Sequence, residues 1–184
     1  LFSIPAPAST VPVASEMMEP TTGTAVAMAL RVICTVMASA APVAAPVSVR
    51  KPVNASMEAV SAALADAPSA REKLRRLFRA LTEAGSELFF EDRKLYDIAA
   101  VAARDKWPST EQYAGHLQQL IGQILVEGRQ AGEFERKTPL DEATLAVYMV
   151  MCPFINPVQL QYNLDTAPTA AVLLASLILR SLSP

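Results

Sequence analysis

The stretch STEQYAGHLQQLIGQILVEGRQAGEF, residues 109–134, decides how the rest of the sequence is interpreted. Its apolar residues recur every three or four positions, a spacing that places them on one face of an α-helix. Ser109 and Gln112 have the spacing of a capping box, and Gly132 suits the left-handed residue that ends a helix. We therefore predict a long amphipathic helix over about residues 109–131. Its inner face consists of Tyr113, Leu117, Leu120, Ile121, Ile124, Leu125 and Gly128.

Three amphipathic helices are predicted upstream of this stretch. Ser69 and Glu72 form a second capping-box pair at the start of one of them. The last of the three ends at Trp107-Pro108, because a residue before proline avoids the helical region; it turns Leu95, Ile98, Ala99 and Ala102 inward. The three helices cover about residues 54–66, 71–90 and 92–106.

Two helices are predicted downstream, over about residues 141–152 and 167–182. The first begins at Pro139 and Asp141 and is interrupted at Pro153. The alternation of apolar and polar residues that marks half-buried strands is absent from this part of the sequence. The predicted fold is therefore all-α, a bundle of about five to six helices.

The last predicted helix is apolar on nearly every side, so it must be covered all round. In a small domain a C-terminal helix is fully covered only if a second chain packs on its outer side. We therefore predict that helices 141–152 and 167–182 of two protomers form a four-helix dimer interface. The alternative is that helix 167–182 is buried in the core of its own protomer. The predicted interface residues are Leu145, Tyr148, Val172, Leu173, Leu177 and Leu179.

Composition divides the 184 residues into two unequal parts. Residues 1–56 hold five charged residues and one aromatic, whereas residues 57–184 hold 29 charged residues and ten aromatics. Only the second part has the make-up of a globular domain. We therefore predict a low-complexity Ala/Pro-rich segment over residues 1–53, mostly disordered, and a helical domain over residues 54–184.

The nearly uncharged stretch at residues 25–47 has three interpretations. A transmembrane helix is disfavoured because Arg31 and two prolines interrupt the apolar run. A signal peptide starting at Met28 would have a short core and lie 27 residues inside the chain. We favour the third interpretation, a short Ala-rich helix near residues 25–40 followed by a linker, and expect no membrane partner.

Residues that carry catalytic or metal chemistry are scarce. The single histidine, His116, has no Ser, Cys or carboxylate partner at helical spacing. Cys34 and Cys152 lie far apart, and neither belongs to a metal-ligand motif. The net charge of −2 argues against a surface that binds polyanions over the whole molecule. We predict no enzyme, no metal and no cofactor.

Several short motifs occur along the predicted helices: RKLYD at residues 93–97, Trp107-Pro108, His116-Leu117 and ILVEGRQAGEF at residues 124–134. Together they resemble the C-terminal regulatory domain of the tetracycline-repressor (TetR) family of bacterial transcription regulators. The segment CPFINP at residues 152–157 is similar to a kink that often precedes the final helix in that family. The resemblance covers about residues 54–184 and implies a cytoplasmic homodimer whose regulatory domain binds a ligand.

The resemblance also implies an effector pocket among the helices at 71–90, 92–106, 109–131 and 141–152. A mostly apolar cavity with a few polar tips would suit a small hydrophobic or aromatic molecule. The alternative is that the large side chains on these helices simply fill the core. The predicted ligand-binding residues are Phe89, Tyr96, Trp107, Tyr113, His116, Met149 and Phe154.

The DNA-binding half of the family is not recognisable in this sequence. Family members begin with a helix-turn-helix domain whose turns need Gly, yet no Gly occurs between Gly23 and Gly85. No DNA-binding residue can therefore be assigned, and DNA is a partner only at the level of the family. We hypothesise a truncated, frameshifted or otherwise altered member.

Two functions from different classes remain open. The first is a ligand-responsive transcription regulator of the TetR type whose DNA-binding half is missing or altered. The second is a helical protein-interaction domain, exported and without DNA binding, whose apolar last helix docks on a partner. A tight homodimer in solution favours the first function and a monomer favours the second.

Overall fold

The computed structural model describes Leu64 and residues 66–184, which form helices and no β-strand. The predicted all-α fold is therefore confirmed for this part of the chain. The predictions for residues 1–53, for a short helix near residues 25–40 and for most of the helix at 54–66 lie outside the described residues. The helices are α3 (Ala70–Glu91), α4 (Arg93–Arg104), α5 (Pro108–Gln130), α6 (Leu140–Ile155), α7 (Pro157–Leu160) and α8 (Ala167–Ser181).

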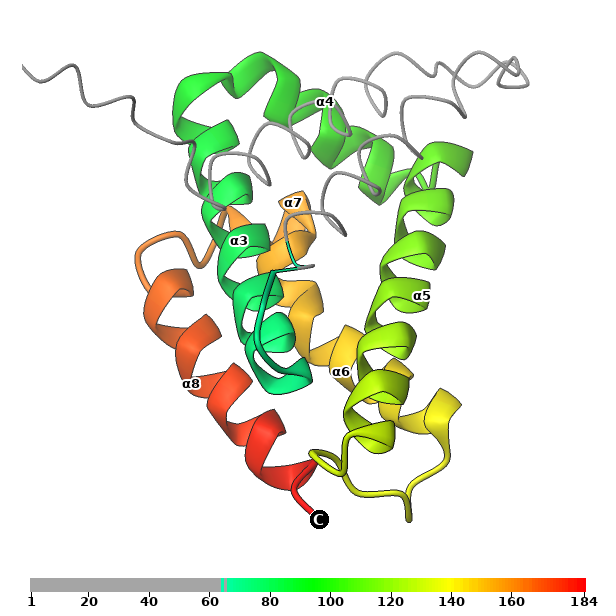
Figure 1. The fold of residues 1–184 in the computed structure, drawn as a ribbon. Coiled ribbons are helices and arrows are strands. Elements are labelled where there is room, and N and C mark those ends of the chain that lie inside the picture. The colour runs from blue at the N-terminus through cyan, green and yellow to red at the C-terminus, as the bar shows by residue number, and fades with distance from the viewer. Residues whose placement is uncertain (1–63, 65) are drawn as a thin grey trace, which may run out of the picture.

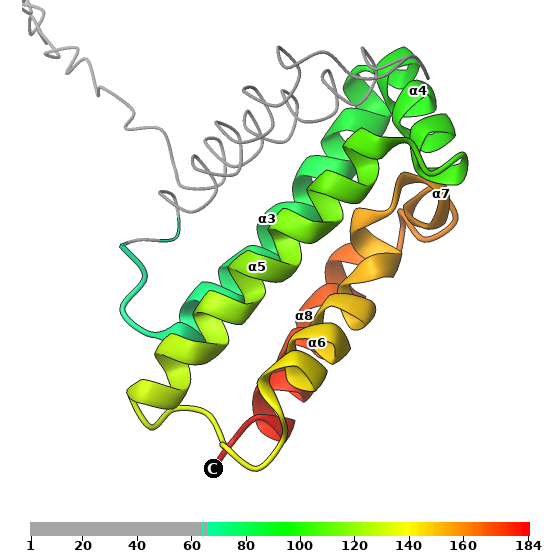
Figure 2. The same cartoon turned by 90° about the vertical axis from the view of Figure 1, so that its right-hand side faces the viewer.

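Four of these helices form two layers. The long helices α3 and α5 lie side by side in one layer, and α6 and α8 form the other (Figure 2). The short helices α4 and α7 pack on each other at the end of the bundle far from the C-terminus (Figure 1). This arrangement leaves the outer side of the α6 and α8 layer free of other described helices.

The main core fills the space between the two layers. Leu74, Leu77, Leu117, Ile121 and Leu125 are fully buried in it. All seven residues predicted for the inner face of the long helix are buried, so the apolar period fixed the orientation of α5 correctly. A smaller cluster of buried residues joins α6, α7 and α8; it consists of Phe154, Leu160, Ala167 and Ala171.

Side chains cap the first two of these helices. Ser69 Oγ accepts a hydrogen bond of 3.1 Å from the Glu72 amide, as the capping-box spacing predicts. Asp92 caps α4 in the same way, by accepting from the Leu95 amide at 3.1 Å. The predicted Ser109 cap of α5 is wrong. That helix begins one residue earlier, with Pro108 in the first turn, where its missing N–H has no helical partner to lose.

Two further details differ from the sequence predictions. Helix α4 buries Tyr96, Ala99 and Ala102, whereas Ile98 is exposed, so the inner face is turned toward Tyr96. Helix α6 continues through Pro153 to Ile155 instead of breaking. A proline removes one helical hydrogen bond, to the carbonyl four residues back, and α6 tolerates that loss within a packed bundle.

Candidate functional site

A cavity of about 90 Å³ lies between α3 and the helices α4 to α7. Small residues leave this space open: Ala84 and Gly85 on α3, Ala103 on α4 and Ala114 on α5. None of the described residues in the lining is charged. The rest of the wall is formed by Leu81, Leu88, Tyr96, Thr110, Tyr113, Tyr148, Cys152, Ile155, Asn156, Pro157 and Leu160.

In two pairs of polar groups in the cavity wall, the members of each pair are hydrogen-bonded to each other. The Tyr96 hydroxyl donates a 2.7 Å hydrogen bond to the carbonyl of Pro157, which ties α4 to the start of α7. Tyr148 and Cys152 lie one turn apart on α6 and share a side-chain hydrogen bond. Burial, and then the Cys152 contact, raise the pKa of Tyr148 to about 12. Burial also raises the pKa of the Cys152 thiol, so both groups are neutral at pH 7.

One hydroxyl of the wall has no such bond. Thr110 lies in the first turn of α5, and its Oγ1 is buried without a hydrogen-bond partner among the described residues. The neighbouring Ser109 hydroxyl is also buried and has no partner in the same part of the chain, but Ser109 does not line the cavity.

Two of the seven predicted ligand-binding residues, Tyr96 and Tyr113, line the cavity. Phe89 lies behind the wall, where its ring meets that of Tyr96 edge-on at 4.9 Å and Arg93 covers it at 4.1 Å. Phe89 therefore supports Tyr96 from outside.

The other four predicted residues do not line the cavity. Phe154 is buried in the smaller core cluster, and Met149 is exposed on α6. Trp107 is half-buried at the start of α5. His116 does not line the cavity, and its Nδ1 is buried without a partner in the part of the chain that the structure describes.

The lining residues that the sequence analysis missed are mostly small or were assigned elsewhere. Ala84, Gly85 and Ala114 shape the cavity through what their side chains lack, and sequence periodicity does not report this. Tyr148 was predicted for the dimer interface but lies in the cavity wall. The i, i+4 spacing of Tyr148 and Cys152 is the one signal that would have found this pair.

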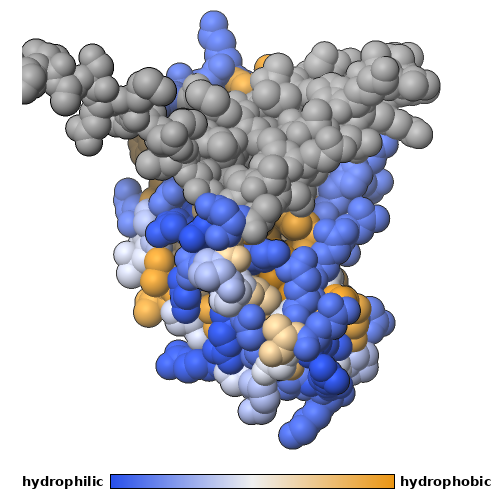
Figure 3. Space-filling view, in the orientation of Figure 1, coloured by the Kyte–Doolittle hydropathy of each residue, from blue (hydrophilic) through white to orange (hydrophobic). Residues whose placement is uncertain are grey.

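An exposed apolar surface, here named the α6–α8 face, covers the outer layer. It consists of Leu145 and Met149 on α6 and Val172, Leu173 and Leu177 on α8, each at least 52% exposed. Figure 3 shows hydrophobic side chains at the surface along the edge where α8 lies. Four of these five residues belong to the predicted interface. The other two predicted interface residues are not on this face: Leu179 is buried in the protomer's own core, and Tyr148 lies in the cavity wall.

The segment from Gly128 to Phe134 joins three parts of the chain. Phe134 is buried against Gly128, and Gly132 adopts the predicted left-handed conformation with φ of +76°. The Glu133 carboxylate accepts hydrogen bonds from the first amides of α3, those of Ala70 at 3.3 Å and Arg71 at 3.0 Å. Arg71 in turn donates to the Glu133 carbonyl at 3.1 Å and to Ser183 Oγ at 2.8 Å.

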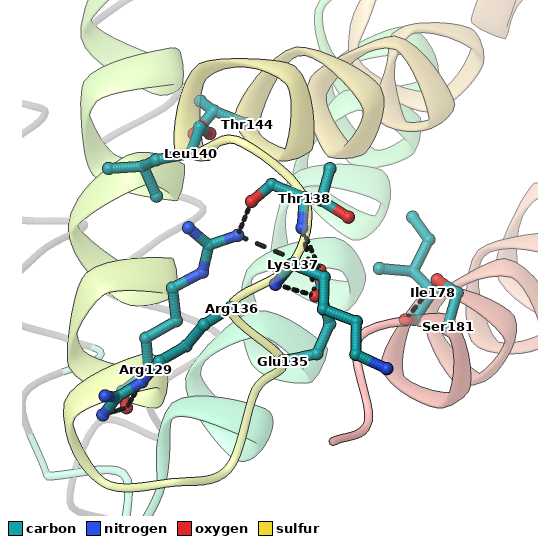
Figure 4. A network of polar contacts seen from close by, with 9 residues as sticks. All are labelled: Arg129, Glu135, Arg136, Lys137, Thr138, Leu140, Thr144, Ile178 and Ser181. Carbon is teal, nitrogen blue, oxygen red and sulfur yellow. Dashed lines mark hydrogen bonds and ion pairs between the residues drawn. The ribbon is translucent and has the colours of Figure 1, made fainter.

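A polar network holds the loop that follows (Figure 4). Arg129 donates to the Thr138 carbonyl at 2.7 Å, and Arg136 donates to the Arg129 carbonyl at 2.6 Å. Glu135 accepts from the backbone amides of Lys137 and Thr138. The hydrogen bond from the Thr138 side chain, and then the backbone amides and the charge of Arg129, hold the pKa of Glu135 below its usual range. These contacts fix the α5–α6 connection, so we assign the network a structural role.

The described residues thus form an all-α domain with an internal cavity and an exposed apolar face. The family described as "Tetracyclin repressor-like, C-terminal domain" matches residues 70–172. The chain belongs to this family, as the sequence motifs predicted, and the family is regulatory, not enzymatic. The family's DNA-binding half is not detected. No curated protein and no solved structure matches the chain.

Two features are absent from the described residues: a membrane-spanning helix and a cluster of metal-ligating side chains. None of their helices has the length and apolar character needed to cross a membrane. Within the same part of the chain, no three His, Cys, Asp or Glu side chains form a group that could hold a metal ion.

Proposed function

We propose that this chain is the ligand-sensing and dimerising part of a transcription regulator, with a small hydrophobic molecule as its effector. The cavity among α3 to α7 is the observation that carries the proposal. An engineered apolar cavity of about 150 Å³ binds benzene, so a cavity of about 90 Å³ fits a ligand no larger than a single ring unless its wall moves.

The α6–α8 face supports a homodimer. Five large apolar side chains from two adjacent helices are exposed there, and a second copy of the same face would cover them by a two-fold arrangement. Two helices from each protomer would then form a four-helix bundle.

The cavity wall also connects ligand binding to the arrangement of the helices. It draws residues from α3, α4, α5 and α6, so a ligand that fits one arrangement of these helices better than another shifts the population toward it. The Tyr96–Pro157 hydrogen bond couples α4 to this wall. DNA binding and a cytoplasmic location are proposed at the level of the family, and no residue of this chain is assigned to DNA.

Calorimetric titration of the full chain with toluene tests the cavity. We expect toluene to bind the wild-type chain and to lose binding in Ala114→Leu, whose larger side chain fills the cavity. Ala131→Leu is the matched control, because Ala131 is exposed just after the same helix. Equal binding by all three proteins would contradict the assignment of the cavity as the ligand site.

Light scattering separates this function from the alternative of a protein-interaction domain. A stable homodimer supports the proposal. A monomer at all concentrations contradicts the dimerising role and favours a surface that docks on another protein.

A further inference from the structure

Leu160, on α7, belongs to two parts of the molecule at once. It lines the cavity, and it is also a buried member of the smaller core cluster that joins α6, α7 and α8. Among the described residues, no other residue of the cavity lining belongs to this cluster. The other members of the cluster are Phe154, Ala167 and Ala171. A ligand that contacts Leu160 in the cavity therefore also affects the packing at the start of α8.

The Leu160 side chain is held by the protein on the side of α3 and has empty space on the side of the cavity. A Cβ atom on Gly85 would lie 2.6 Å from Leu160 Cδ2, so the leucine packs directly on the backbone of α3. The Tyr96 hydroxyl holds α7 from α4 through its 2.7 Å hydrogen bond to the Pro157 carbonyl. Atoms that line an empty space lack van der Waals contacts on that side. A ligand in the cavity supplies these contacts to Leu160.

Backbone hydrogen bonds connect Leu160 to α8. The Leu160 carbonyl accepts from the Asn163 amide at 2.8 Å, and the Asn163 carbonyl accepts from the Ala167 amide at 2.7 Å. Ala167 is the first residue of α8 and is fully buried. The connection between α7 and α8 is therefore short and hydrogen-bonded, so the start of α8 follows the position of α7.

The first two turns of α8 also carry part of the α6–α8 face. Ala171 belongs to the core cluster, and Leu174 packs against it. Val172 and Leu173, which lie between these two residues in the sequence, are exposed on the face. The position of these two turns therefore determines how Val172 and Leu173 meet a second protomer.

We propose that Leu160 couples the cavity to the dimer interface, so that a single-ring ligand in the cavity strengthens the homodimer. This inference rests on the proposed function, since it needs the cavity as the ligand site and the α6–α8 face as the interface. The ligand fills the space beside Leu160 and thereby stabilises the described positions of α7 and of the start of α8. The dimer gains stability when the ligand binds, and dimerisation in turn increases the affinity for the ligand.

Sedimentation-velocity titrations of the full chain, with and without saturating toluene, measure this coupling. We expect toluene to lower the dimer dissociation constant of the wild-type chain about five-fold. Leu160→Ala removes the side chain that the cavity and the cluster share, so this variant should bind toluene and dimerise with a dissociation constant that toluene leaves unchanged. Leu160→Val is a smaller truncation that replaces Leu160→Ala if the latter does not fold, and it should show a weaker effect of toluene than the wild type.

Leu88→Ala is the matched control, because Leu88 lines the same cavity from α3 and does not belong to the smaller core cluster. This substitution also enlarges the cavity, yet toluene should strengthen the dimer of this variant as it does that of the wild type. The comparison separates a loss of coupling at Leu160 from a simple enlargement of the cavity.

Each contrary result has a distinct meaning. If toluene binds and the chain dimerises, but toluene leaves the wild-type dimer unchanged or weakens it, the coupling is overturned and the proposed function stands. An effect of toluene in the Leu160 variant as large as in the wild type, or its loss in Leu88→Ala, overturns the role of Leu160. If toluene does not bind the wild-type chain, or if the chain is a monomer at all concentrations, that part of the proposed function fails and the inference fails with it.

Discussion

Gly128 shows why the Gly-rich end of α5 has the sequence it has. A Cβ atom at this position would lie 2.1 Å from Cδ2 of Phe134, whose ring packs directly on the helix backbone. Phe134 can be buried there only because residue 128 has no side chain. The motif that carries the family resemblance is thus, at this residue, a packing requirement.

Gly128→Ala should lower the free energy of unfolding by about 2 kcal/mol, because the added methyl group displaces the Phe134 ring. Gly115→Ala, on the same helix, is the control. A Cβ there meets no atom within 4 Å, so the variant should gain about 0.5–1 kcal/mol from the better helix propensity of alanine. Urea denaturation at fixed protein concentration measures both values, and equal effects would contradict the packing explanation.

The Glu133 side chain caps a helix that lies far away in the sequence. Its carboxylate accepts from the amides of Ala70 and Arg71 at the positive end of α3. We expect Glu133→Gln to destabilise the domain by about 1 kcal/mol, since it removes the charge from this cap. Glu87→Gln, at an exposed position far from the start of α3, should change stability much less in the same denaturation experiment. If the two variants behave alike, Glu133 has no capping role.

Tyr148 makes stability depend on alkaline pH. Its pKa is about 12 in the folded protein against an ordinary value of 10.0, so folding favours the protonated hydroxyl. The stabilisation is complete below pH 10 and is lost as the pH rises from 10 toward 12. In urea denaturation over that range, Tyr148→Phe should lose stability less steeply than the wild-type chain. Tyr162→Phe, at an exposed position, should follow the wild-type curve, and a shallower curve for this control instead would contradict the assignment.

At the scale of the helix, α6 shows the limit of prediction from sequence. Tyr148 was assigned to the dimer interface and Met149 to the ligand site, whereas the structure places Tyr148 at the cavity and leaves Met149 exposed. Adjacent residues on a helix point about 100° apart, so a small error in the orientation of the helix exchanges their environments. Helix α6 is apolar on several sides, and its period therefore fixes its orientation poorly, whereas the single stripe of α5 fixed it correctly.

Leu173 provides the test of the α6–α8 face. A glutamate at this exposed position would be buried without a partner in the proposed dimer, at a cost of about 3 kcal/mol or more. We expect Leu173→Glu to convert the dimer into a folded monomer in light scattering. Phe90→Glu replaces another exposed apolar residue, at the end of α3, and should leave the dimer intact. A Leu173→Glu dimer as stable as that of the wild type would exclude this face as the interface.

For the whole molecule, the sequence predicted which segments are helical more completely than it predicted the site. Capping residues and an apolar period are local signals, and they located α3, α4, α5 and α8 within a few residues. The cavity depends on where Ala84, Gly85, Ala103 and Ala114 face one another across helices, and no local pattern records that arrangement. Large side chains such as Phe154 were predicted to bind the ligand because of their size. A large residue more often fills a core than lines an empty space.

The central claim is that the cavity among α3 to α7 is the ligand site. Anomalous diffraction from crystals of the full chain soaked with 4-bromophenol tests it most directly. We predict a bromine peak inside the cavity, between Leu81 and Tyr148. An empty cavity, with bromine only at the protein surface, would contradict it.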